Sequence, residues 1–317
     1  MSLSPHFGIV IYPTAGHPPE QFRLAKLADD NDLDLLTMPD HPYQGGFFDT
    51  WTLLAALALA TKRLHFSANV TTLPLRLPSM LAKQAATLDI LTGGRVEMSL
   101  GAGFAWDGIE AYGGPRRTPA EAYAAFEDAL HILRGLWDGT NRSFSYSGKF
   151  YSVKGAMVGP APAHSIPIWT GAYGPKMMRL TGRLADGLLV TSSVNPPQRL
   201  LEIKTLIDEG AAAAGRSPEA IRRGYNILGT IASGQNNSGN FGQSIEGTAS
   251  YWVDQLVRLY SDYRQDTFVF VAKGDVGQQI EMFAKEVVPA VKERVGASEK
   301  SPAFKSPAAL PLGTKPH

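Results

Sequence analysis

A histidine and a carboxylate stand side by side in the segment Met38-Pro39-Asp40-His41-Pro42. A histidine of near-neutral pKa can give or take a proton, and a neighbouring carboxylate can orient its ring. The segment directly follows a short apolar run at 34–38, of the kind that forms buried strands. We therefore predict that Asp40 and His41 form a proton-handling pair where this strand ends. The alternative is a capped turn that leaves the histidine on the surface.

A glycine-rich turn follows Trp169 and leads into a predicted helix. The free N–H groups at the start of a helix and the positive end of its dipole attract anions, and Lys176 would add a positive charge. We predict a phosphate site there; the alternative is a tight turn with a solvated lysine. The residues expected to hold the phosphate are Gly171, Ala172, Tyr173, Gly174, Pro175 and Lys176.

Three other predicted strand ends carry weaker signals. At 69–72, an amide and two hydroxyls could hydrogen-bond the edge of a heteroaromatic ring. At 101–106, two glycines would let a ligand approach the backbone closely, and the aromatic side chains would offer stacking faces. At 191–192, hydroxyl groups again stand at the end of a strand. Each of these segments is compatible with a bound ring system, and none identifies one alone.

Other chemistries lack the residues that they need. The sequence has 0 cysteines, which excludes a disulfide framework, thiolate metal sites and a cysteine nucleophile. It contains no H-x-x-x-H pair and no G-x-S-x-G elbow, which argues against a metallohydrolase and a serine hydrolase. Redox chemistry would therefore need a bound cofactor. Asp107 and Glu110 are predicted to be exposed carboxylates of a short helix, and Asp186, which precedes a strand, to be structural.

Eight apolar or β-branched runs alternate with amphipathic stretches along the chain. This alternation predicts an α/β fold of parallel βαβ units, and eight such units close a (β/α)8 TIM barrel. The alternative is an open doubly wound sheet, but YPTAGHPP and not G-x-G-x-x-G follows the first strand. The predicted strands are 7–12, 34–38, 64–70, 95–101, 166–171, 187–192, 225–232 and 266–271. Capping residues or prolines predict helix starts at Pro18-Pro19, Asp49-Thr50, Pro78 and Pro119.

Two segments interrupt this alternation. Residues 139–165, after the fourth predicted helix, combine aromatic–polar alternation with glycine turns, which predicts an inserted hairpin or long loop. Residues 233–247, after the seventh predicted strand, are rich in Gly, Asn and Ser and predict either a mobile loop over the active site or a plain surface loop. Residues 298–317 are Pro-rich without a helical period and are predicted to be disordered. We thus expect one barrel domain over residues 1–297.

Charge and hydropathy narrow the classes of partner. Lys and Arg total 30 and Asp and Glu 29, and the net charge of +1 provides no general attraction to nucleic acid or to an anionic membrane. The first residues lack the pattern of a signal peptide, and the longest apolar run, 53–60, is too short to span a bilayer. We expect a cytoplasmic protein that acts on a small molecule.

Four segments together resemble the bacterial luciferase-like monooxygenase superfamily, over residues 7–295. They are MPDHPY at 38–43, LTGGRVEMSLGAGF at 91–104, WDGIEAYGGPRRTP at 106–119 and PIWTGAYGPKMMRLTGRLADG at 167–187. Within the superfamily the chain resembles the branch of oxidoreductases that use the deazaflavin coenzyme F420, on the GGPRRTP segment in particular. The resemblance implies coenzyme F420 as cofactor, with FMN as the alternative because both occupy the same position in the barrel, and it implies a homodimer.

The resemblance also implies roles for individual residues. Asp40 and His41 would lie near the coenzyme ring, and a bulge with a non-proline cis peptide at Asn69-Val70 would lie behind it. The remaining coenzyme contacts that it implies are Gly101, Ala102, Gly103 and Phe104 along the side chain, Gly171 to Lys176 at the phosphate, and Thr191 and Ser192 on the far side. Asn69 departs from the small hydroxyl residue often found there, and Phe104-Ala105 stands where some members carry a polar or acidic pair.

For an F420 enzyme, the resemblance implies hydride transfer between C5 of the deazaflavin and a small organic substrate. His41, or Asp40 through it, would donate or accept the proton. With FMN, the reduced ring would react with O₂ and the enzyme would be a monooxygenase. A flavin-binding relative that has lost turnover is the non-catalytic alternative.

Overall fold

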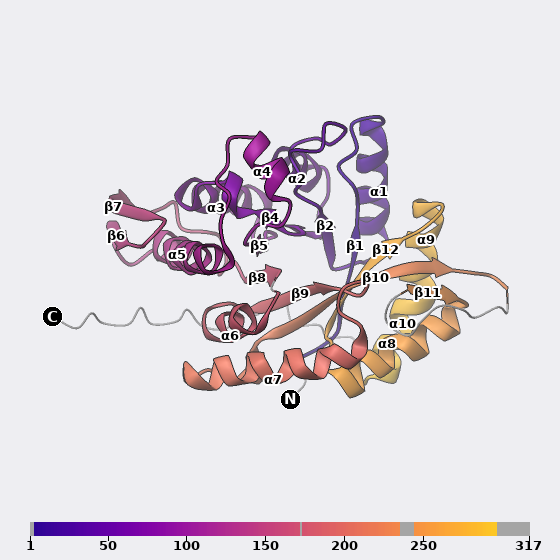
Figure 1. Cartoon of the computed structure of the whole chain (residues 1–317). Coiled ribbons are helices and arrows are strands. Elements are labelled where there is room, and N and C mark those ends of the chain that lie inside the picture. The colour runs from indigo at the N-terminus through magenta and orange to yellow at the C-terminus, as the bar shows by residue number, and fades with distance from the viewer. Residues whose placement is uncertain (1–2, 172, 235–243, 297–317) are drawn as a thin grey trace.

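Eight parallel strands form the wall of a nearly closed barrel in the computed structural model, which describes residues 3–171, 173–234 and 244–296 (Figure 1). The strands are β1 (His6–Val10), β2 (Leu35–Met38), β3 (His65–Ala68), β5 (Met98–Gly101), β8 (Ile168–Gly171), β9 (Gly187–Thr191), β10 (Arg222–Ile231) and β12 (Thr267–Ala272). They are hydrogen-bonded in the order β3-β2-β1-β12-β10-β9-β8-β5, and a parallel bridge between Phe66 and Val96 brings the two ends of the sheet together. The predicted barrel is confirmed, and the open sheet is wrong.

Helices surround the barrel, and the first four of those that follow, with α6, begin where the sequence predicts. They are α1 (Pro18–Asp30), α2 (Thr50–Leu59), α3 (Pro78–Thr92), α5 (Pro119–Trp137), α6 (Pro175–Leu184), α7 (Pro197–Ala213), α8 (Ala249–Tyr263), α9 (Val276–Met282) and α10 (Val288–Arg294). Asp49 caps α2 by accepting a hydrogen bond from the Thr52 N–H, and Thr118 and Glu121 form a capping box at α5. These caps satisfy N–H groups that the first turn of a helix leaves free, so the predicted boundaries are also the observed ones.

Acidic side chains accept hydrogen bonds from backbone N–H groups at the amino ends of the strands. The Asp29 carboxylate accepts hydrogen bonds from the backbone N–H groups of residues 62–64, which lead into β3. Asp186 accepts one from the Ile168 N–H at 2.8 Å and forms an ion pair with Arg134. The predicted structural role of Asp186 is confirmed. This end of the barrel serves stability, which leaves the carboxyl ends of the strands for function.

The first insertion is an antiparallel hairpin of β6 (Ser143–Ser147) and β7 (Ser152–Met157), as predicted. The prediction of a loop over 233–247 is wrong at its end, because Ser244–Gly247 forms strand β11, which pairs in parallel with β10. Residues 235–243 and the predicted tail lie outside the described residues. Among the helices that the structure describes, none combines the length and the apolar character needed to cross a bilayer.

Candidate functional site

The loops that follow the carboxyl ends of the barrel strands gather at one end of the barrel, which we call the mouth. In a parallel barrel all strand ends of one kind meet, so residues far apart in sequence become neighbours there. The residues predicted for catalysis and for coenzyme binding all stand in these loops or at the ends of the strands that lead into them. Ala172, one of the predicted phosphate residues, lies outside the described residues.

The Asp40 carboxylate is fully buried and is paired with an arginine. Arg76 donates to both of its oxygens, through Nε at 2.9 Å and Nη2 at 2.7 Å, and the Thr72 N–H donates to it at 2.9 Å. Arg76 also pairs with Asp49, the cap of α2. The hydrogen bond that the proton-handling pair would need between Asp40 and His41 is therefore not formed, because the carboxylate is committed to Arg76 and to the backbone after β3.

The His41 ring has a different partner. Its Nδ1 atom lies 2.7 Å from the hydroxyl oxygen of Tyr43, and the ring is half-buried. Burial lowers the pKa of His41 below its ordinary value, while the negative charge of Asp40 acts in the opposite direction. Burial, assisted by the same charge, raises the pKa of Tyr43. At neutral pH the pair is therefore an uncharged imidazole held by a phenol, and it can exchange a proton through the free Nε2.

Two asparagines from opposite parts of the chain form the polar floor of the mouth. The Asn69 amide donates to the Asn226 side-chain oxygen at 2.9 Å, and the Asn226 amide donates back at 3.2 Å. The Thr37 and Thr191 hydroxyls accept further hydrogen bonds from this pair at 3.0 and 3.2 Å. These hydrogen bonds use both hydrogens of each amide, so the asparagines can offer a heteroaromatic ring edge only their oxygens, as acceptors.

A bulge separates β3 from the short strand β4 (Thr71–Thr72) and contains the predicted cis peptide bond at Asn69-Val70. The Val70 side chain fills the space beside two glycines. A Cβ atom at Gly101 would lie 2.6 Å from Val70 Cγ2, and one at Gly171 would lie 3.0 Å from it. Val70 therefore uses the space that the missing side chain of Gly101 leaves, and contact of this glycine with a ligand stays a prediction.

Gly103, next to Ala102 and Phe104, is also packed against a neighbouring side chain. Its φ of +109° favours glycine, and a Cβ there would lie 2.6 Å from the Trp106 ring. Trp106 begins helix α4 (Trp106–Ala111), whose carboxylates Asp107 and Glu110 pair with Arg116 on the surface, as predicted. Phe104 is 85% exposed.

The predicted phosphate site forms the start of helix α6. Gly174 is its N-cap with φ +83°, Pro175 occupies the first turn, and a Cβ at Gly174 would meet nothing within 4 Å. Within the described part of the chain no side chain caps this helix. The exposed Lys176 and the half-exposed Tyr173 stand at this helix start. At the next strand end, the Ser192 side chain is buried, whereas Thr191 is half-buried.

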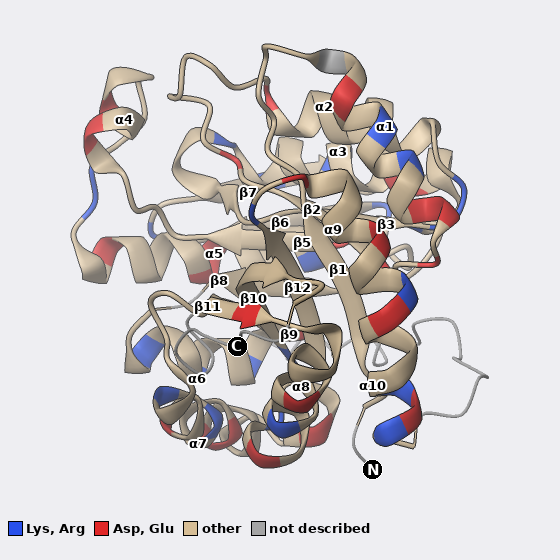
Figure 2. Cartoon of the chain, turned by 90° about the vertical axis from the view of Figure 1, so that its right-hand side faces the viewer, with Lys and Arg blue, Asp and Glu red and all other residues tan. Residues whose placement is uncertain are grey.

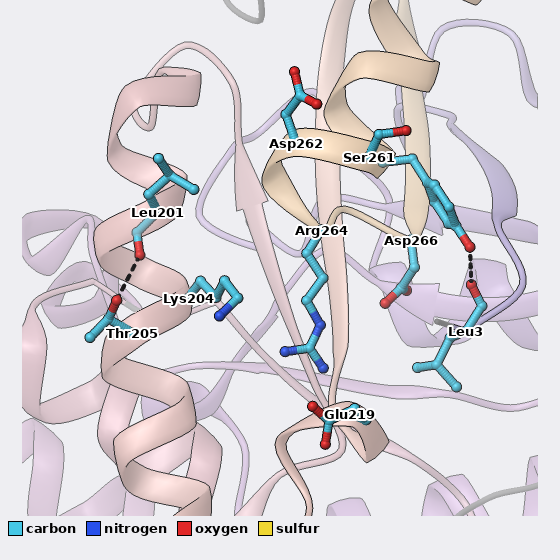
Figure 3. Close-up of a pocket in the computed structure, with 10 residues that line it drawn as sticks. Leu3, Leu201, Lys204, Thr205, Glu219, Ser261, Asp262, Arg264 and Asp266 are labelled. Atoms are coloured by element: carbon cyan, nitrogen blue, oxygen red, sulfur yellow. Dashed lines mark hydrogen bonds between the residues drawn. The ribbon is translucent and has the colours of Figure 1, made fainter. Parts of the chain in front are cut away.

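A cavity of about 640 Å³ lies at the opposite end of the barrel (Figure 3). It is lined by residues that precede strands or belong to α7 and α8, such as Leu3, Glu219 and Asp266. Its polar groups are used within the protein: Tyr260 donates to the Leu3 carbonyl, and Asp266 accepts from the Arg223 N–H. We therefore place the candidate site at the mouth.

Four residues of the mouth escaped the sequence analysis: Thr37, Tyr43, Arg76 and Asn226. Asn226 and Thr37 are buried polar residues inside predicted strands, a pattern that indicates a hydrogen-bonded layer and could have identified them. Arg76 lies 36 residues from its partner Asp40 in the chain, and Tyr43 lies two residues from His41, but neither spacing is a pattern that predicts a contact.

Known proteins share sequence and fold with this chain. The family model described as luciferase-like monooxygenase matches residues 2–236. An F420-dependent glucose-6-phosphate dehydrogenase of Nocardia farcinica is 32% identical over 219 residues, which cover 66% of this chain and 64% of that protein. The chain thus matches somewhat under two thirds of the length of this relative.

Solved structures share the fold. An F420-dependent secondary alcohol dehydrogenase, in complex with an F420-acetone adduct, superposes with a TM-score of 0.80 at 20% identity, covering 91% of this chain and 99% of that one. The coenzyme F420-dependent tetrahydromethanopterin reductase of Methanopyrus kandleri gives a TM-score of 0.80 at 21% identity, covering 91% and 100%. Together with the family model, which spans most of the barrel, these matches show that the chain belongs to the luciferase-like monooxygenase family.

Proposed function

We propose that the protein is a coenzyme F420-dependent oxidoreductase that acts on a small organic substrate. The observation that carries this proposal is that a half-buried imidazole and an uncapped helix start stand at the same mouth. The relative named as an F420-dependent dehydrogenase supports it.

The residues of the mouth fit a flavin-type coenzyme. The start of α6 has no side-chain cap among the described residues, so its first N–H groups would bind a phosphate, and Lys176 stands in its first turn. The Asn69–Asn226 pair offers oxygen acceptors for a ring edge, and Val70 provides an apolar surface beside it. When bound, F420 supplies a carbon centre that accepts or gives a hydride.

The chain's own residues then orient the reactants and handle the proton. His41 exchanges the proton at Nε2, and Tyr43 fixes the ring through Nδ1. Asp40 acts as a positioning residue, because its pair with Arg76 ties the segment that carries His41 to the loop after β4. The residues from Gly101 to Phe104, together with Thr191 and Ser192, would flank the coenzyme.

FMN is the alternative coenzyme, because a helix start binds the phosphate of either molecule. A deazaflavin has carbon at position 5 and transfers hydride without oxygen, whereas an FMN monooxygenase needs O₂. A flavin-binding protein without turnover would bind one of the two and convert nothing.

Titration of the purified protein with F420 and with FMN separates these functions. We expect F420 to bind more tightly than FMN and substrate turnover to continue under strict anaerobiosis. Tighter FMN binding, with product formation that stops when oxygen is removed, would overturn the coenzyme assignment. Binding without turnover on any hydride donor or acceptor would favour the non-catalytic relative.

We also propose one barrel domain over residues 1–297, a cytoplasmic location and a homodimer. Exposed apolar side chains on the neighbouring helices α2 and α3 support the homodimer, among them Leu59, Met80 and Leu91, which are 62%, 56% and 62% exposed. Light scattering coupled to size-exclusion chromatography should give twice the mass of the 34.2 kDa chain.

A further inference from the structure

Apolar side chains are exposed around the mouth, on loops that follow four different strands. Tyr12 follows β1, Phe104 follows β5, Tyr173 follows β8 and Val194 follows β9, and they are 49%, 85%, 50% and 49% exposed. Single exposed apolar residues are ordinary, but several at one opening indicate a surface that a ligand covers. We call these four residues the apolar rim.

Phe104 belongs to the loop that reaches the proposed proton-handling group. Helix α4, which begins at Trp106, contacts Tyr43 at Gly108, where a Cβ would lie 2.7 Å from the Tyr43 ring. Tyr43 in turn lies 2.7 Å from His41 Nδ1. The loop that carries Phe104 is therefore held against the segment that carries His41, so a molecule at His41 would lie beside this loop.

Charged residues of the mouth are mostly neutralised. Carboxylates pair with Arg76, Arg116 and Lys273, whereas the Arg117 guanidinium lies over the Phe150 and Tyr151 rings. Elsewhere, acidic and basic side chains are interleaved along outer helices such as α7 and α8 (Figure 2).

Two cations of the mouth, Lys176 and Arg199, stand in the first turns of α6 and α7. These helices pack against each other, so both cations lie on the side proposed for the coenzyme phosphate. The mouth thus offers the body of a substrate apolar surface and no clustered charge.

We infer that the substrate is an uncharged molecule with an aromatic or branched aliphatic body, and that the apolar rim, of which Phe104 is the most exposed member, determines this specificity. This inference rests on the proposed function and narrows it. An anionic substrate would need cations opposite its charge; the sugar phosphate in the name of the Nocardia farcinica relative is an example. The apolar rim would remove water from that charge and would offer no hydrogen bond or counter-charge in its place.

Calorimetric titration tests the inference on the full chain, with and without F420. The probes are 1-phenylethanol, which is uncharged and aromatic, and glucose 6-phosphate. We expect 1-phenylethanol to bind with a negative heat-capacity change and at least about 10-fold more tightly than glucose 6-phosphate. Phe104→Ala should weaken the binding of 1-phenylethanol about 10-fold, and Phe104→Leu should restore most of it.

Met157→Ala is the matched control, because it removes an exposed apolar side chain from the hairpin and should leave binding unchanged. Equal thermal midpoints of the variants would show that they fold alike. Tighter binding of glucose 6-phosphate, no binding of 1-phenylethanol, or an unchanged Kd in Phe104→Ala would overturn the inference. Each of these results leaves the proposed function intact if F420 binds in a separate titration, whereas loss of F420 binding itself would overturn the proposed function.

Discussion

The Nδ1 atom of His41 lies 2.7 Å from the hydroxyl oxygen of Tyr43, and this contact, not the adjacent carboxylate, fixes the imidazole at the mouth. A ring held at one nitrogen presents the other in a constant direction and tautomer. The proton chemistry of the site therefore depends on a phenol two residues away in the chain.

Replacing Tyr43 with Phe should lower kcat about 5-fold to 10-fold, because the ring of His41 loses one hydrogen bond of about 1 kcal/mol. The Kd for the coenzyme should stay within about 2-fold, since Tyr43 is not among the proposed coenzyme contacts. Tyr112→Phe, which removes a hydroxyl from an exposed tyrosine, is the control. An equal loss in both variants would contradict a role for the His41–Tyr43 contact.

His41→Ala should lower turnover by about 10²-fold to 10⁴-fold, the usual effect of a positioned acid or base, with a smaller change in coenzyme affinity. In the direction that oxidises the substrate, the neutral imidazole accepts the proton. Burial lowers the pKa of His41, so kcat/KM should be constant near pH 7 and should fall as the pH decreases below about 6.5. A pH profile of His41→Ala should lack this acidic decrease, and retention of it would assign the proton transfer to another group.

Asp40→Asn should destabilise the fold by about 3–5 kcal/mol, because it leaves the buried side of Arg76 without its counter-charge. Urea unfolding followed by circular dichroism measures this. Asp107→Asn also removes an arginine partner, but on the surface, and should leave the midpoint of unfolding unchanged. If Asp40→Asn had the same midpoint of unfolding as Asp107→Asn, the buried Asp40–Arg76 pair would not stabilise the fold.

Gly101→Ala should cost about 1–3 kcal/mol, because the new methyl group would overlap Val70. The Val70→Ala change should recover part of this loss in the double variant, and a thermodynamic cycle measures the coupling. Gly16→Ala, at a position with nothing within 4 Å, is the control. Additive effects of the changes at 101 and 70 would show that the valine does not fill the glycine's space.

Lys176→Ala should weaken coenzyme binding by about 1–2 kcal/mol, since the backbone N–H groups of α6 would still hold the phosphate. The Kd of F420, measured by fluorescence at two salt concentrations, should rise and become less sensitive to salt. An unchanged Kd would place the phosphate elsewhere.

The barrel and its helix boundaries could be predicted because they depend on local patterns. Apolar runs of strand length and prolines or caps at helix starts act within a few residues, and the structure confirms them. The start of α6 could be predicted for the same reason. The resemblance to the family, and not the composition, led to the cis bond at Asn69-Val70.

The partners inside the site could not be predicted in this way. Asp40 is adjacent to His41 in sequence, yet it pairs with Arg76, 36 residues away, and Gly101 accommodates a valine from the segment between β3 and β4. Such choices depend on which side chains the closed barrel brings together. Adjacency in the chain suggested a contact between Asp40 and His41 that the structure does not form. The glycines alone could not show whether the space beside them holds a ligand or a side chain of the protein.

The floor of the mouth joins two asparagines that are 157 residues apart in the chain. No fragment that ends before β10 contains both halves of this layer, and the coenzyme ring proposed to lie on it would meet a complete floor only after Asn226 has arrived. Ligand binding at this layer would therefore report that β10 has joined the strands that precede it in the chain. A newly made chain would gain its coenzyme, and the stability that binding adds, only after β10 has been added.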